Sequence, residues 1–433
     1  MQIVKDKLNR TIAPKIVDAV EFELGLPAYE KKILKNGVEV YAINLGTQET
    51  MMVNWVFNAG NWFEEKNLIA PATNYLIKNG TSTRNAFAIN EHFEFYGSYL
   101  NRSCQNETAE ITLHCLSRHA RSLLPVVTEL IHDSIFPGEE LNIFKKNMQQ
   151  RLEVSLMKSD FVAGRLIDSY LFGERHPYGR YSTLADYASL EREEISKFFE
   201  EFYKQGRCAI FLAGKLPDNI LDDIETHFGS LPLKPLMTAG FRPNPIDPAK
   251  TKKYSITNDP DGVQGAIRIA RNFPNRHHPD FQKAQVLNHI FGGFFGSRLM
   301  ANIREDKGYT YGIYSYLINQ IQDSAWMIST EAGKEVCGAT VAEVYREMKR
   351  LCDEPVSKEE LQTTRNAMIG TILGDLDGPF QVLGRWKNIL LNQLDEKYFY
   401  KGIEIIKTIS AEELRELARK YFEPDNFYEL VVI

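Results

Sequence analysis

The sequence repeats itself at a distance of about 220 residues, and this repeat limits the possible folds more than any other feature. Glu140 opens one expected helix and Glu360 opens another, at an offset of 360 − 140 = 220. Glu194 and Glu413 each lead a helix that is followed by an apolar strand, at an offset of 413 − 194 = 219. Acidic residues are favoured where helices begin. Two patterns displaced by nearly the same distance indicate a duplicated chain.

A proline-rich segment separates the two copies. Five of the 18 prolines fall between Pro232 and Pro248. Because proline fixes φ and cannot donate a backbone hydrogen bond, this segment is expected to be an extended linker. The expected organisation is an N-terminal domain over residues 1–230, a linker over 231–250 and a C-terminal domain over 251–433.

Both strand and helix patterns occur within the first copy. Apolar residues alternate with others over 38–42 and again over 51–57, as in half-buried strands. A helix is expected over 69–78, closed by the Asn79-Gly80 pair. We therefore predict an α+β fold of two homologous halves of about 220 residues, each a mixed β-sheet with helices packed on one face.

Composition excludes several classes of function. A net charge of −6 argues against a general nucleic-acid surface. The sequence has no apolar run of about 18 residues, so no membrane span is expected. Residues 1–17 carry basic side chains but no signal-peptide core. The cysteines are odd in number and lack a Cys-x-x-Cys pair, which favours a reducing compartment; they are Cys104, Cys115, Cys208, Cys337 and Cys352.

The segment from Leu68 to Thr81 is similar to the zinc-binding helix of the M16 (pitrilysin/insulinase-like) peptidases. Active members have Gly-Leu-Ala-His-x-x-Glu-His and then Lys-Gly-Thr. Two histidines four residues apart share one helix face and can hold zinc, while the glutamate acts as general base. In this sequence Pro71, Asn74 and Tyr75 stand in those three places. The resemblance therefore implies an M16 fold whose zinc site is lost.

The family's third ligand is a glutamate about 75 residues further on, which falls near Gln150 or Arg151 in this sequence. Neither residue is a carboxylate, although Glu153 would restore one if the register slipped. No two of the nine histidines lie four residues apart, and the nearest spacing of this kind is His114 to His119. We expect Gln150 to complete a degenerate site, and the chain to bind no metal.

The second copy keeps the other half of the family's active site. A turn over 292–299, Gly-Gly-Phe-Phe-Gly-Ser-Arg-Leu, precedes Arg304, and Tyr311 follows seven residues later (311 − 304 = 7). Gly308 lets the chain turn from a helix into a strand between them. In the family this pair contacts the substrate backbone, Arg304 through its guanidinium and Tyr311 through its hydroxyl.

These residues also have plainer interpretations. Arg304 could be a surface helix residue and Tyr311 a core residue of a strand. Tyr309 and Tyr314 are the rivals of Tyr311 if the alignment slips, and Arg298 is expected to stabilise the structure. The glycine-rich turn lacks the spacing of a phosphate-binding loop and is expected to be a tight turn.

Residues 97–101 resemble the family's edge strand, which binds peptide by strand addition. Asn101 is therefore a candidate substrate-binding residue. Arg102 stands where the family has a small residue, which counts against peptide pairing at this edge.

The resemblance implies a non-catalytic subunit that positions a peptide substrate with Arg304 and Tyr311. Zinc and the general base would come from a sister M16 chain that keeps its zinc motif; a homodimer is the other assembly considered. The chain is not expected to be an enzyme by itself or to carry a cofactor of its own.

The alternative is a purely structural or peptide-binding protein without a role in catalysis. A hydrolase with another nucleophile is disfavoured, because the sequence has no Gly-x-Ser-x-Gly elbow. A cytoplasmic location is favoured, and a periplasmic one would require a signal peptide upstream of Met1.

Overall fold

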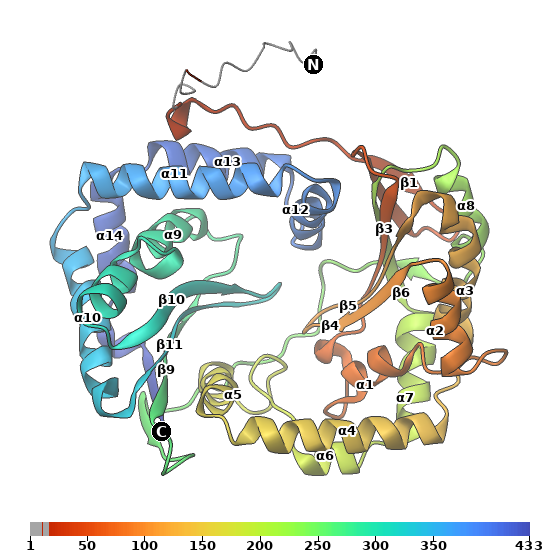
Figure 1. The fold of residues 1–433 in the computed structure, drawn as a ribbon, viewed down its shortest axis with the longest axis horizontal. Helices are drawn as coiled ribbons and strands as arrows, with labels where there is room; N and C mark the ends of the chain where they lie inside the picture. The colour runs from red at the N-terminus through yellow and green to blue at the C-terminus, as the bar shows by residue number, and fades with distance from the viewer. Residues whose placement is uncertain (1–10, 12–16) are drawn as a thin grey trace.

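The computed structural model describes residue 11 and residues 17–433, which form two halves lying side by side (Figure 1). The rest of the 1–17 segment considered for a signal peptide lies outside the described residues. Each half is built on one β-sheet, so the predicted α+β class is confirmed.

The first half contains a seven-stranded mixed sheet. Its strands run in the order β1-β2-β6-β3-β5-β4, and β7 pairs with β6. β2 and β6 are parallel, while β3 is antiparallel to both β6 and β5. The strands are β1 (Glu30–Ile33), β2 (Glu39–Asn44), β3 (Thr50–Phe57), β4 (Tyr99–Cys104), β5 (Ala109–Leu116), β6 (Arg207–Gly214) and β7 (Lys234–Pro235).

The second half repeats this topology in five strands. The order β8-β12-β9-β11-β10 matches β2-β6-β3-β5-β4 strand for strand, and the parallel pair recurs as β8 and β12. This agreement confirms the two repeated halves. The strands are β8 (Lys253–Ile256), β9 (Gln264–Phe273), β10 (Thr310–Asn319), β11 (Ser324–Gly333) and β12 (Tyr428–Val432).

Helices surround both sheets. The period-two alternation in β3 sends Val53 and Trp55 to one face, where they join a buried cluster with residues of α3 and α7. The helices of the first half are α1 (Ile69–Leu76), α2 (Ala86–Phe95), α3 (Ala120–Asp133), α4 (Gly138–Leu156), α5 (Ser159–Phe172), α6 (Leu184–Ala188), α7 (Arg192–Phe199), η4 (Glu200–Lys204) and α8 (Ile220–Phe228). Those of the second half are α9 (Phe281–Asn288), η5 (His289–Gly293), η6 (Met300–Asp306), α10 (Cys337–Asp353), α11 (Lys358–Asp375), α12 (Pro379–Leu391), α13 (Glu396–Thr408) and α14 (Ala411–Tyr421).

The repeated glutamates have the same local roles in both halves. Glu194 closes a capping box with Glu191 at the start of α7, and Glu413 closes one with Ser410 at the start of α14. A capping box satisfies backbone N–H groups that the first helical turn leaves without a partner. These two glutamates are therefore a local signal for equivalent helix starts.

The other pair of glutamates makes equivalent tertiary contacts. Glu140 accepts a hydrogen bond from Asn79 at 2.8 Å, and Glu360 accepts one from Arg298 at 2.7 Å. Asn79 and Arg298 are themselves separated by 298 − 79 = 219 residues. The repeat thus preserves a contact between the first turn of a long helix and the segment it packs against, which is a turn at Asn79 and a helix start at Arg298.

The two halves exchange helices. Ile167 and Leu171 of α5 are buried with Ala270 and Leu430 of the second sheet. In return, α12 packs on β2 and β6 of the first sheet, which Figure 1 shows beside that half. The expectation of helices on one face of each sheet was therefore wrong, because each sheet receives a helix from the opposite half on its other face.

Polar side chains at equivalent positions of the exchanged helices reach the opposite sheet. Lys387 of α12 donates to Glu110 at 2.7 Å and to Asn54 at 3.1 Å. Asp168 of α5, at an offset of 387 − 168 = 219, lies near Arg268 of β9. Burial raises the pKa of Asp168 to about 7, and Arg268 opposes this rise.

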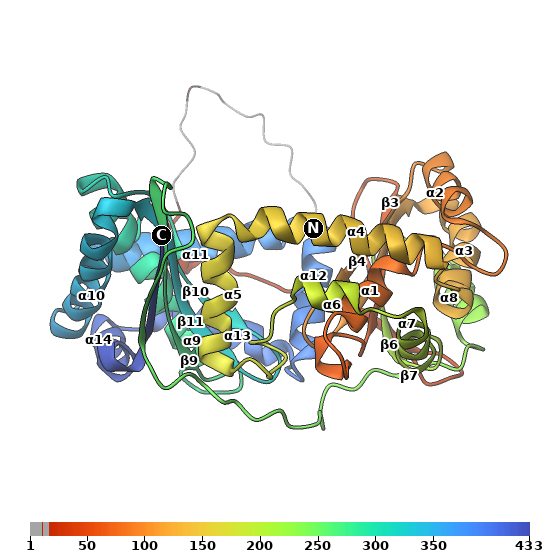
Figure 2. The ribbon, with the colours of Figure 1, turned by 90° about the horizontal axis from the view of Figure 1, so that it is seen from below.

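The linker follows β7 along one side of the molecule to β8, as Figure 2 shows. Apart from the two residues of β7, its residues 231–250 form no helix or strand. Within the described residues, no helix is both long and apolar enough to cross a membrane.

We expect Ile167→Ala to lower the free energy of unfolding by about 2–5 kcal/mol, because Ile167 is fully buried between α5 and the opposite sheet. Val154→Ala, at a site that is 60% exposed on α4, is the control and should stay within about 0.5 kcal/mol. Chemical denaturation of the full chain measures both. Equal losses in the two variants would contradict the role given to α5.

A second expectation concerns pH. Because the folded pKa of Asp168 is raised to about 7 from 3.8, the unfolded chain releases this proton first as the pH rises. Asp168 therefore costs stability progressively between pH 3.8 and about 7. Asp168→Asn should gain stability relative to wild type over that window, while Arg268 and Tyr316 still face the site. Denaturation of both proteins at several pH values tests this, and a pH-independent difference between them would contradict it.

Candidate functional site: a degenerate metal helix and an arginine–tyrosine pair

Helix α1 carries the positions where the sequence predicts a lost zinc site. Pro71 sits in its first turn, where a missing N–H costs little. Asn74 is buried, and its amide donates to the backbone oxygen of Glu110 at 3.2 Å and to the Tyr203 hydroxyl at 3.1 Å. Asn74 therefore ties α1 to β5 and η4 and is not free to bind a ligand through that amide nitrogen.

Tyr75 is held by two neighbours. Its ring packs on Phe144 of α4, with 4.9 Å between ring centroids. The Arg102 guanidinium lies 5.0 Å from the centre of the same ring and donates to the Tyr75 backbone oxygen. Burial lowers the pKa of Arg102, with Tyr75 and Tyr99 opposing. Tyr75 stands where the family has its second histidine, and its ring is in contact with the Arg102 guanidinium and the Phe144 ring.

The predicted third position does not complete a metal site. Gln150 is exposed on α4, and so are Arg151 and Glu153. Among the described residues, no three His, Cys, Asp or Glu side chains gather in a way that could hold a metal ion. Since proline offers no donor atom and Asn74 is already engaged, these residues do not fit zinc.

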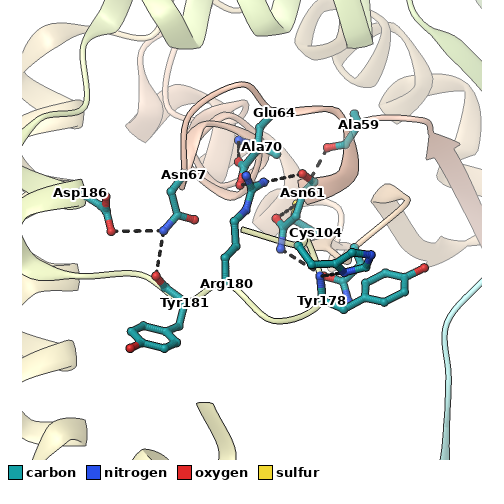
Figure 3. Close-up of polar contacts among 12 residues, drawn as sticks. Ala59, Asn61, Glu64, Asn67, Ala70, Cys104, Tyr178, Arg180, Tyr181 and Asp186 are labelled. Atoms are coloured by element: carbon teal, nitrogen blue, oxygen red, sulfur yellow. Dashed lines mark hydrogen bonds and ion pairs between the residues drawn. The ribbon is translucent and has the colours of Figure 1, made fainter. Parts of the chain in front are cut away.

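A buried ion pair orders the entry into α1 (Figure 3). The Glu64 carboxylate accepts from Arg180 at 2.6 Å and from the Ala70 N–H at 2.8 Å, and Arg180 also donates to the Asn61 oxygen at 2.5 Å. Burial raises the pKa of Glu64 to about 7, while Arg180 and the Ala70 N–H oppose the rise. Sequence reasoning missed this pair, although Glu64 precedes a helix start and Arg180 directly follows the His-Pro-Tyr-Gly segment.

A second contact in Figure 3 fixes the same loop. The Asn67 amide donates to the Tyr181 oxygen at 2.9 Å and to Asp186 at 3.2 Å. Asp186 is also part of the capping box of α6. The start of α1 is therefore bound to the segment that leads into α6.

The structure brings Arg304 and Tyr311 together. The Arg304 guanidinium lies 5.6 Å from the centre of the Tyr311 ring and 4.6 Å from that of Phe295. Tyr311 is 91% exposed, so it is not a core residue. The pair can therefore offer a guanidinium and a phenol to a ligand at the surface of β10.

Local geometry explains this juxtaposition. Gly308 has φ +64°, a conformation that favours glycine, and it turns the chain from η6 into β10. β10 is irregular between Thr310 and Ile313, in the stretch that contains Tyr311. Of the rival tyrosines, Tyr309 packs against the core and Tyr314 is exposed further along the strand.

The glycine-rich turn and Arg298 have structural contacts. A Cβ on Gly292 would lie 2.8 Å from the Ser315 backbone nitrogen, so this turn packs closely against β10. Arg298 binds both oxygens of Glu360, at 2.7 and 2.9 Å. Both observations agree with the structural interpretations made from the sequence.

Asn101 is exposed on β4, at one edge of the first sheet. β10, which carries Tyr311, forms the equivalent edge of the second sheet. Asn101 is thus in another half of the molecule from Arg304 and Tyr311. Part of the β10 edge is already bonded, because the Ile313 N–H donates to Met300 and the Ser315 oxygen accepts from Asn288.

Fold and site together define a duplicated α+β protein whose helix α1 carries no set of metal-binding side chains among the described residues. Residues 189–368 match a family model described as the Peptidase M16 inactive domain. That match begins between α6 and α7 and ends within α11. Over residues 189–368 the chain is thus similar to the Peptidase M16 inactive domain.

Two bacterial relatives are similar over most of the chain. One, named an uncharacterized zinc protease YmxG of Bacillus subtilis, is 25% identical over 412 residues, covering 92% of this chain and 96% of the relative. Another, named a non-peptidase homolog YmxG of Helicobacter pylori, is 23% identical over 331 residues, covering 74% of each. Sequences similar to this chain are thus named both as a zinc protease and as a non-peptidase homolog.

Solved structures share the fold. A peptidase M16 inactive domain from Pseudomonas fluorescens superposes with a TM-score of 0.84 at 20% identity, covering 93% of this chain and 98% of that one. A chain of Complex III2 from Candida albicans superposes with a TM-score of 0.72 at 14% identity, covering 94% and 96%. The same architecture therefore also occurs within a multi-subunit complex.

We expect the purified chain to retain well below one zinc ion per molecule after exposure to zinc and desalting. The reason is that Pro71, Asn74 and Tyr75 offer no set of zinc donors and that Gln150 is not a carboxylate. Elemental analysis measures the ratio. One zinc per chain, lost on changing Asn74 or Tyr75, would overturn this expectation.

Proposed function

We propose that this chain is the non-catalytic, substrate-positioning subunit of a heteromeric M16-type zinc peptidase. Arg304 and Tyr311 would contribute to a composite site, and a sister chain with an intact zinc motif would supply the metal and the general base. The observation that carries the proposal is the contrast between the two halves. The zinc positions are replaced and engaged in internal contacts, whereas Tyr311 beside Arg304 is exposed.

The chemistry of the pair suits a peptide backbone. Arginine presents charged N–H donors to carbonyl or carboxylate oxygens, and a tyrosine hydroxyl adds one more donor. β10 is an edge strand, and because its Ile313 N–H and Ser315 oxygen are already bonded to Met300 and Asn288, an extended peptide would pair with other backbone groups of this edge. The substrate would therefore be a peptide bound in extended form, with Asn101 of β4 as a further candidate contact.

A scaffold without a role in catalysis is the second candidate. It is favoured by the contacts of Arg304 with the Phe295 and Tyr311 rings, which give the guanidinium an internal role. The likeness to a chain of Complex III2 also agrees with a role in assembly.

The test is reconstitution with an M16 chain of the same organism that keeps His-x-x-Glu-His. The mixture should cleave peptides that neither chain cleaves alone. Arg304→Ala or Tyr311→Phe should slow cleavage by roughly 10²-fold or more, the usual cost of losing one donor that stabilises the transition state.

Two controls sharpen this experiment. Arg121→Ala, at an exposed arginine of α3, should leave the rate unchanged. Tyr314→Phe decides between the neighbouring tyrosines of β10, and we expect it to have a smaller effect than Tyr311→Phe. If the Arg304→Ala and wild-type subunits support equal rates, the scaffold function remains.

A further inference from the structure

The second half contains a cavity that the proposed peptidase function does not use. It measures about 300 Å³ and lies among α9, α11, α12 and α13, which Figure 1 shows gathered on one side of that half. A water molecule occupies about 30 Å³ in the liquid, so roughly ten non-hydrogen atoms fit. This volume is at the lower end of the range for small-molecule sites.

Two arginines with unused donors line the cavity. Arg276 donates to the Asn388 side chain, and Arg385 donates to Asp375 at 2.5 Å. The Nε atom of each guanidinium is buried and has no hydrogen-bond partner among the described residues. A buried charged donor without an acceptor is costly, so the described residues leave neither guanidinium fully satisfied.

A histidine adds a third unused group. The Nε2 atom of His289 is buried and lacks a partner within the described part of the chain. Its ring stacks on Phe294, with 4.7 Å between centroids and an angle of 2°. Burial lowers the pKa of His289 to about 4, so the ring is neutral near pH 7 and can donate or accept one hydrogen bond.

The charge and polarity of the walls specify the ligand. Arg276 and Arg385 face a single carboxylate, Asp375, which leaves a net charge of 2 − 1 = +1 in the lining. Apolar side chains form part of the remaining wall and include Ile372, Ile389, Phe399 and Ile403. Uncharged polar side chains, among them Gln282, Thr371 and Asn388, form the rest. A singly charged anion with an apolar body matches both features.

We propose that this cavity binds a small amphiphilic carboxylate, with its head on Arg276 and Arg385 and its tail among the isoleucines. Guanidinium groups match the planar geometry of a carboxylate. An eight-carbon chain with its two oxygens has ten non-hydrogen atoms and suits the volume.

Octanoate titrated into the full chain by calorimetry is the direct test. We expect octanoate to bind. Octanol has the same tail without the charge, and its affinity should be lower by about tenfold or more. Inorganic phosphate, which has charge without a tail, should also bind more weakly. Octanol or phosphate binding as tightly as octanoate would overturn the proposal, as would no binding of octanoate.

Variants locate the site. Arg276→Gln and Arg385→Gln should each weaken octanoate binding about tenfold or more, because each removes a charged donor. Arg419→Gln on α14, outside the cavity, is the matched control and should leave the affinity unchanged. His289→Phe keeps the stack on Phe294 and should weaken binding less than the arginine variants.

Unchanged octanoate affinity in folded Arg276→Gln and Arg385→Gln proteins would place the ligand elsewhere and overturn the proposal. Circular dichroism checks that each variant is folded. If either variant is unfolded, the comparison of octanoate with octanol on the wild-type chain decides the proposal without it.

Discussion

The exchange of α5 and α12 is the contact on which the rest of the structure depends. Each sheet has a second apolar face, and the other half of the chain supplies the helix that covers it. Each half needs a helix of the other half to bury the second face of its sheet, so the free energy gained by burying that face stabilises both halves together. The equivalent positions 168 and 387 carry the polar part of this exchange, with an aspartate near Arg268 in one case and a lysine bound to Glu110 in the other. The duplication has thus kept the geometry of the exchange while its electrostatics differ.

The exchange also positions the candidate sites. α12 holds Lys387 against Glu110 and Asn54, and the Glu110 backbone accepts the Asn74 hydrogen bond from α1. Glu110 of β5 therefore connects helix α1 with helix α12 of the opposite half. On the other side, Arg298 fixes the glycine-rich turn to α11, and that turn supports β10 and Tyr311. Tyr311 consequently sits on a strand that contacts within the second half hold in place.

Sequence patterns predicted those features that depend on local contacts. Glu194 and Glu413 revealed the repeat because a capping box needs residues only three positions apart. The pairing of Arg304 with Tyr311 was predictable because one short turn, with Gly308 at positive φ, connects them.

The exchanged helices were missed because an amphipathic pattern shows that a helix is buried but not which sheet covers it. Likewise, Glu64 and Arg180 are 116 residues apart, and no periodic pattern relates them. The cavity lined by Arg276 and Arg385 lies among four helices. It was not predicted because sequence patterns do not show which helices pack together.

The residues of α1 at the positions compared with metal ligands are stabilised by contacts with other protein groups. A cluster of two imidazoles and two carboxylates is stable as a unit when a cation neutralises it, and without metal its carboxylates would repel each other. Here Asn74 contributes an amide and Tyr75 an aromatic ring, and the Arg102 guanidinium lies over that ring. The amide is satisfied by Tyr203 and by backbone, and the aromatic pair with Phe144 joins α1 to α4. Helix α1 thus keeps its place in the fold through contacts among protein groups, so its stability does not require a metal.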